Sequence, residues 1–225
     1  MASNKTFGER AITYFKSLNQ PKKLPGGVKI INPYRSQKVK RIVKEFFSTF
    51  YNDSNERLFV IGINPGRFGG GLTGISFTDP VALRDSCGIK NNLSTRMELS
   101  SIFIYKVIDR FGGVDKFFSK VFLTALYPLA IIKNGKNYNY YDEKKLYSSL
   151  KHEIVKTVSS QIEFGAERKR AIILGKKNAK FFKPLNEEFG FFKNITVLDH
   201  PRYIMQYKRK HFNSYLNKYL ELINI

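Results

Sequence analysis

The chain has 225 residues, 42% of them hydrophobic, and its 20 Phe and 13 Tyr suffice for one folded domain with a substantial core. A single cysteine, Cys87, excludes an internal disulfide and any four-cysteine metal site, and no apolar run approaches the roughly 20 residues that span a bilayer. The 39 Lys and Arg against 18 Asp and Glu give a net charge of +21. A basic surface can serve solubility alone, but a charge of this size favours the interpretation that the protein binds nucleic acid.

Residues 1–52 are expected to form a helical N-terminal extension packed on a single domain that spans residues 1–225. The first residues lack the hydrophobic run of a signal peptide, so we expect a soluble protein of the cytoplasm, at the bacterial nucleoid if it acts on DNA. The stretch SQKVKRIVKEFFSTFY has apolar side chains at helical spacing and predicts an amphipathic helix. These side chains are Val39, Ile42, Val43, Phe46, Phe47 and Phe50.

Four short runs of apolar, often β-branched residues predict strands of a parallel sheet that is covered on both faces. They are LFVIGI (58–63), VFLTAL (121–126), AIILG (171–175) and ITVLD (195–199). Helical patterns separate them at 97–111, 142–163 and 176–189, and a last pattern covers 205–222. The alternation predicts an α/β fold, a three-layer α/β/α sandwich with a central, mainly parallel four-stranded sheet.

The residues that follow each strand are the candidate functional residues, because ligands bind beyond the carboxyl ends of such sheets. Asn64-Pro65-Gly66 follows the first run, and His200-Pro201-Arg202 follows the last. Taken alone, the first motif is typical of an ordinary turn, and a single His after a strand is more often structural than catalytic. Neighbouring strand ends in one sheet would nevertheless bring Asn64 and His200 into one cleft.

The glycine-rich stretch GRFGGG (66–71) is neither a dinucleotide-binding loop nor a P-loop, since its glycines do not open a helix in the required order and no Gly-Lys-Ser/Thr follows. Its glycines instead suit a backbone that approaches a flat ligand closely. Asn, His and a nearby aromatic ring, without a metal cluster, reactive thiol or carboxylate pair, suit cleavage of an N-glycosidic bond.

GINPGRFGGGLTGISF (62–77) closely resembles the first motif of the single-strand-selective monofunctional uracil-DNA glycosylases, within the uracil-DNA glycosylase superfamily. Every position of that motif is matched, including the 13-residue step from Asn64 to Phe77. DHPRYIMQYKRK (199–210) resembles the closing motif of the superfamily, in the form of the second, bacterial branch. The resemblance implies a monofunctional DNA glycosylase of base excision repair that leaves an abasic site, needs no cofactor or metal, and acts on DNA as a monomer.

The resemblance also implies a role for individual residues. Asn64 would hold the attacking water, and His200 would donate a hydrogen bond to the uracil O2. The peptide N–H of Ile63 would face the base carbonyl, and Phe77 would stack on the flipped base, although a core position for Phe77 is about as plausible. The segment that enters or touches DNA would contain Arg202, Tyr203, Lys208, Arg209 and Lys210.

One position departs from the family pattern. Where the family has an Asn that recognises the uracil edge, three residues before a Pro-Leu pair, this chain has Ala125. Thr124, or Asn134 and Asn137 in the following loop, are the candidates for replacing that amide, and a preference for another deaminated base such as xanthine is open.

Two other functions remain open from the sequence. A non-catalytic protein that binds single-stranded nucleic acid would also use a basic surface and exposed aromatic rings. A hydrolase of free nucleosides or nucleotides is the second alternative, but its expected Asp cluster is absent from the sequence, and a small substrate does not require a charge of +21.

Overall fold

The computed structural model describes residues 5–21 and 23–224. Residues 1–4, 22 and 225 of the single domain predicted for residues 1–225 lie outside the described residues. The strands are β1 (Val28–Ile31), β2 (Arg57–Gly62), β3 (Val121–Ala125), β4 (Ala130–Lys133), β5 (Lys136–Tyr138), β6 (Ala166–Leu174) and β7 (Asn194–Leu198). The α-helices are α1 (Phe7–Ser17), α2 (Gln37–Phe50), α3 (Gly70–Thr73), α4 (Pro80–Asp85), α5 (Leu99–Phe111), α6 (Val114–Phe118), α7 (Lys144–Ile162), α8 (Lys176–Phe189), α9 (Pro201–Tyr207) and α10 (Phe212–Asn224). Two short 3₁₀ helices are η1 (Pro33–Arg35) and η2 (Arg209–His211).

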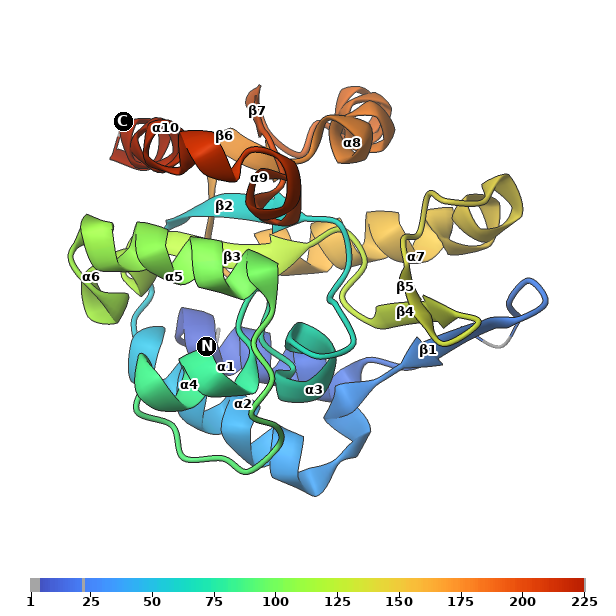
Figure 1. Cartoon of the computed structure of the whole chain (residues 1–225). Coiled ribbons are helices and arrows are strands. Elements are labelled where there is room, and N and C mark those ends of the chain that lie inside the picture. The colour runs from blue at the N-terminus through green and yellow to red at the C-terminus, as the bar shows by residue number, and fades with distance from the viewer. Residues whose placement is uncertain (1–4, 22, 225) are drawn as a thin grey trace.

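The central sheet has four strands in the order β3-β2-β6-β7, and every neighbouring pair is parallel. Strands β2 and β3 are buried along their whole length, as their continuous apolar sequences predict. Helices cover both faces, with α5 in front of the sheet and α7 behind it in Figure 1. The predicted α/β/α sandwich is therefore confirmed, with its four strands within two residues of the predicted positions at their carboxyl ends.

A second, smaller sheet was not predicted from the sequence. Its strands lie in the order β1-β4-β5, and both pairs are antiparallel. Each strand has only three or four residues, too few for an alternating pattern to stand out. Because β1 belongs to residues 1–52, that segment is not purely helical, and its strand is paired with the middle of the chain.

The amphipathic helix expected after residue 36 is α2, and all six of its predicted apolar side chains are buried. Helix α1 begins with a capping box in which the Thr6 hydroxyl accepts from the Glu9 N–H and the Glu9 carboxylate accepts from the Thr6 N–H. Its first residue, Phe7, is fully buried and stacks on Tyr51 at the end of α2. The N-terminal segment thus contributes side chains to the main core.

A further local expectation is wrong. The helix expected over 205–222 is divided into α9 and α10 by η2, a basic turn in which no residue is buried, so apolar periodicity could not place the break. The glycine-rich stretch contains a single helical turn, α3, which ends at Gly74 with a φ of 76°.

None of the described helices has the length and apolar character needed to cross a membrane.

Candidate active site

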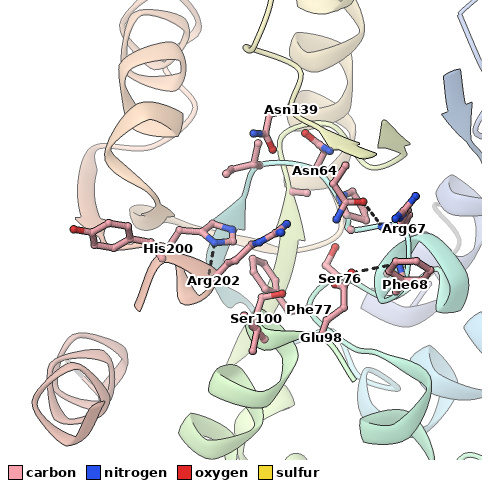
Figure 2. Close-up of a pocket in the computed structure, with 18 of the residues that line it drawn as sticks. Asn64, Arg67, Phe68, Ser76, Phe77, Glu98, Ser100, Asn139, His200 and Arg202 are labelled. Carbon is pink, nitrogen blue, oxygen red and sulfur yellow. Dashed lines mark hydrogen bonds between the residues drawn. The ribbon is translucent and has the colours of Figure 1, made fainter. Parts of the chain in front are cut away.

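A cavity of about 800 Å³ opens at the carboxyl edge of the central sheet. Its walls come from the segment after β2, the turn before α5, the end of β3, the region around β5, and helix α9. Figure 2 shows Asn64, Phe77 and His200 facing the same space from three different segments. The strand ends that the sequence singled out therefore meet in one site, as parallel topology requires.

The side chain of Asn64 is fixed at both ends of its amide by the backbone beside β5. Its Nδ2 donates to the Tyr138 carbonyl at 3.0 Å, and its Oδ1 accepts from the Tyr140 N–H at 3.2 Å. One N–H of the amide and one lone pair of its oxygen remain for a ligand. The orientation of Asn64 is therefore set before any substrate binds.

Phe77 lies at the cavity wall in a backbone conformation that is rare for a large side chain, with a φ of 58°. Its ring occupies the space beside Gly62, where an added Cβ would lie 2.4 Å from the Phe77 Cζ. The His200 ring is 5.8 Å away, centroid to centroid. Because Gly62 has no side chain, the Phe77 ring fits beside it and lines the cavity. A flat ring in this position suits stacking on a planar ligand.

His200 is the N-cap of α9, and its Nδ1 accepts from the Arg202 N–H at 3.2 Å. The neutral ring must then carry its proton on Nε2. Burial of the ring, with a further contribution from the Arg202 charge, lowers the pKa of His200 to about 4. At neutral pH the site therefore holds an uncharged imidazole with one N–H available to a ligand.

Glu98 lies beneath the glycine-rich stretch, and its Oε1 accepts from the Phe68 N–H at 3.3 Å. A Cβ at Gly66 would lie 2.3 Å from Glu98 Oε1, and one at Gly69 would lie 2.4 Å from Oε2, so the loop closes around the carboxylate only because these residues are glycines. Burial raises the pKa of the Glu98 carboxyl, opposed in part by the Phe68 N–H. Within the described chain, no group of three His, Cys, Asp or Glu is placed to hold a metal ion.

The family model described as Uracil DNA glycosylase superfamily matches residues 48–224, most of the chain. The chain belongs to the uracil-DNA glycosylase superfamily. A solved structure, "The crystal structure of WT Pedobacter heparinus SMUG2", is 38% identical in sequence, covers 97% of this chain and 97% of that chain, and superposes with a TM-score of 0.94. No curated protein matches the chain.

These findings confirm the resemblance to the bacterial branch of the single-strand-selective monofunctional type. As a member of the uracil-DNA glycosylase superfamily, the chain is a DNA glycosylase, a hydrolase of N-glycosyl bonds that acts in base excision repair. Its partner is DNA, and nothing supports the alternative of a non-catalytic nucleic-acid-binding protein.

Most site residues expected from the glycosylase resemblance line the cavity, and some do not. Those that line it are Ile63, Asn64, Phe77, Ala125, His200, Arg202 and Tyr203. Thr124 is not among them: its buried hydroxyl donates to Gln161 Oε1 in helix α7, because successive strand residues point to opposite faces. Lys208, Arg209 and Lys210 also lie outside the cavity lining, in the turn after α9.

The sequence missed several residues of this glycosylase site. Arg67, Phe68, Arg96, Glu98 and Asn139 all line the cavity. Asn137, which the sequence did name as a possible replacement for the missing amide, also lines the cavity; it lies in β5, and its Oδ1 accepts from the Arg67 N–H at 3.1 Å. Arg67 and Phe68 lie inside the quoted motif. Arg96 lies just before the helix predicted over 97–111 and Glu98 in its first turn, but no spacing rule connects residue 98 with residue 66.

Exposed large hydrophobic side chains gather at the cavity. Of the described residues, the exposed large hydrophobic side chains are Met97, Leu99, Phe189, Tyr203 and Tyr207. All but Phe189 line the cavity, and Tyr203 and Tyr207 lie 5.5 Å apart, ring to ring, on α9. We call these four residues the apolar rim.

Proposed function

We propose that this chain removes uracil, and other deaminated bases such as xanthine, from DNA by water-mediated hydrolysis that leaves an abasic site. The observation that carries the proposal is the meeting of Asn64, Phe77 and His200 in one cavity, each held by contacts independent of substrate. The target base would enter the cavity in a flipped conformation, because its reacting bond is inaccessible inside a duplex.

In the proposed reaction, Phe77 stacks on the flipped base and Asn64 holds a water through its free N–H and lone pair. The C1′–N bond breaks, and its electron pair passes to the base as negative charge. His200 donates through Nε2 to the base O2, where this charge accumulates, and the peptide N–H of Ile63 faces the same base. The water oxygen bonds to C1′ and releases its proton to solvent.

The low pKa of His200 supports its role as a neutral donor. A neutral imidazole places no positive charge beside a sugar that itself becomes cationic in the transition state. It still donates a hydrogen bond to the departing base, where a donor stabilises the developing negative charge.

We further propose that the enzyme discriminates between target bases less strictly than it would with an amide side chain at position 125. Ala125 lines the cavity but offers no hydrogen bond, so a base with a different edge meets fewer mismatched groups there. Asn137 and Asn139 line the same cavity, but Asn137 is engaged with Arg67 and Asn139 with Asp142. We also propose that the protein acts as a monomer in the cytoplasm.

The test is a panel of oligonucleotides that contain uracil, hydroxymethyluracil, xanthine or hypoxanthine, each in single and double strands. Strand scission that appears only after hot alkali supports a monofunctional glycosylase, because alkali cleaves at an abasic site. Scission without alkali would contradict the water mechanism, and no scission with any base would contradict the proposal.

Replacing Asn64 by Ala should slow base release by roughly 10²–10³ while DNA affinity stays near that of the wild type, the usual scale for one oriented polar group. The measurement is the single-turnover rate together with the dissociation constant for the same oligonucleotide. Asn186→Ala, which removes a distant amide at the end of α8, is the matched control for rate. A wild-type rate in Asn64→Ala would remove Asn64 from the mechanism.

A further inference from the structure

Two arginine side chains at the cavity wall share one aromatic ring. The guanidinium carbon of Arg67 lies 4.4 Å from the centre of the Phe68 ring, and that of Arg96 lies 3.9 Å from it. Both distances are typical of cation–π contacts. We call this group the Arg67–Phe68–Arg96 stack; Figure 2 shows Arg67 and Phe68 across the cavity from His200 and Arg202.

The stack is held by the same contacts that fix the active-site loop. The Arg67 N–H donates to Asn137 Oδ1 at 3.1 Å, and the Phe68 N–H donates to Glu98 Oε1 at 3.3 Å. Arg67 follows Asn64-Pro65-Gly66 directly in the chain. The backbone that carries the Phe68 ring and Arg67 is therefore held at a defined position relative to Asn64, and the Arg96 guanidinium is placed there through its contact with the ring.

The two guanidinium groups have no acidic partner: among the described residues, neither Arg67 nor Arg96 forms an ion pair. Two like charges around a single ring repel each other, and the repulsion is relieved when an anion binds to both. Guanidinium groups also match the geometry of phosphate oxygens and can donate two parallel hydrogen bonds.

We propose that the Arg67–Phe68–Arg96 stack binds a backbone phosphate of the DNA strand that carries the target base. Arg202 lies across the cavity from the stack, and Tyr203 beside it on α9 also lines the cavity. The strand would therefore be held on both sides of the flipped nucleotide. This inference rests on the proposed function in taking DNA as the ligand, but it concerns affinity and not chemistry.

The experiment measures the affinity of the full chain for an oligonucleotide with a non-hydrolysable uracil nucleotide, over a range of KCl concentrations. Arg67→Gln/Arg96→Gln should weaken binding about 10-fold at moderate salt and reduce the slope of log affinity against log salt by about 1, as expected when a phosphate contact is lost. Arg67→Lys/Arg96→Lys retains both charges but loses the planar stacking, so the salt slope should persist while affinity falls several-fold.

The matched control is Arg110→Gln/Lys120→Gln, which removes two exposed charges at the far end of α5 and before β3, away from the cavity. It should change affinity much less. Equal losses in the control and the stack variant, or a wild-type affinity in Arg67→Gln/Arg96→Gln, would overturn the inference. Because binding is measured without base release, a protein that excises no base can still support the phosphate site, and an active protein can still contradict it.

Discussion

Glu98 explains why the chain has glycines at positions 66 and 69, next to Asn64. The carboxylate fills the space where both Cβ atoms would lie and accepts from the Phe68 N–H. The glycines are therefore required by a partly buried acid and not only by the approach of a ligand, which was the interpretation from sequence. We propose that Glu98 acts through the loop, as a positioning residue for Asn64.

Gly66→Ala should lower the single-turnover rate at least about 10-fold, because its methyl group displaces the Glu98 carboxylate and shifts the loop that carries Asn64. In Gly66→Ala/Glu98→Ala the clash is absent, so the double variant should be no slower than Glu98→Ala alone. Gly26→Ala is the control, since an added Cβ there meets nothing within 4 Å. Additive losses in the double-mutant cycle would contradict the proposed contact.

The depressed pKa of His200 gives a defined pH dependence. The unfolded chain protonates this ring near pH 6.5, whereas the folded chain does so near pH 4. The stabilising effect of the neutral ring is therefore present above pH 6.5 and is lost as pH falls towards 4. We expect a rate that is flat from pH 6 to 8 and declines towards pH 4, when protonation of Nδ1 breaks its hydrogen bond to Arg202.

Single-turnover rates and urea unfolding, both measured from pH 4 to 8, check this expectation. His200→Asn provides the comparison, since an Asn can cap α9 without titrating. A wild-type rate that falls already between pH 7 and 6, with a midpoint near 6.5, would show that the His200 pKa is not lowered.

At the scale of elements, the β4–β5 hairpin is what orients Asn64. Tyr138 and Tyr140 contact both ends of the Asn64 amide, and the Tyr140 hydroxyl donates to Asn178 Oδ1 at 2.8 Å in α8. Asn178 Nδ2 in turn donates to the Ile61 carbonyl of β2 at 3.4 Å. The hairpin is thus tied through buried polar groups to the strand that carries Asn64.

Tyr140→Phe should destabilise the fold by about 1–3 kcal/mol, because it leaves the buried Asn178 oxygen without its donor. The rate should also fall several-fold as the backbone beside Asn64 loosens. Urea unfolding and single-turnover rates check both effects. Tyr147→Phe, on α7 and outside the cavity, is the matched control. An unchanged rate in a destabilised Tyr140→Phe would show that the hairpin does not position Asn64.

The elements predicted from sequence are those with long apolar patterns. Strands β2, β3, β6 and β7 and helix α2 carry enough buried side chains to be recognised, and the parallel sheet then places Asn64 and His200 at one edge. The small sheet could not be predicted, because its strands are short and its pairing of β1 with β4 joins residues about a hundred positions apart. The role of Glu98 could not be predicted either, because it contacts backbone N–H groups, and every residue except proline has one whatever its side chain.

At the scale of the whole molecule, the N-terminal helices and the central sheet share one core. The Arg57 side chain at the start of β2 is fully buried, pairs with Asp53 at 2.8 Å, and lies 4.7 Å from the ring centres of both Phe7 and Tyr51. A buried cation that depends on rings from α1 and from the end of α2 ties these parts together. We propose that residues 1–225 unfold as a single unit.

Phe7→Ala should destabilise the protein by about 3–5 kcal/mol, because it leaves a cavity and removes the ring over Arg57. The melting temperature should fall on the order of 10 °C in one cooperative transition, measured by circular dichroism. Lys16→Ala, exposed on the same helix, is the control. A separate early transition, with the remainder of the protein unaffected, would show that the N-terminal segment is an independent unit.

The apolar rim of Met97, Leu99, Tyr203 and Tyr207 has a thermodynamic consequence that charge alone does not give. With a net charge of +21, we expect most of the association with DNA to be electrostatic and driven by release of counterions, which depends on salt and hardly on temperature. Covering the rim with unstacked bases removes apolar surface from water, and that carries a negative change in heat capacity. Binding of undamaged DNA through its backbone should therefore respond mainly to ionic strength. Binding of a flipped base should also become more exothermic on warming. The search for a lesion and its capture would then have different calorimetric signatures.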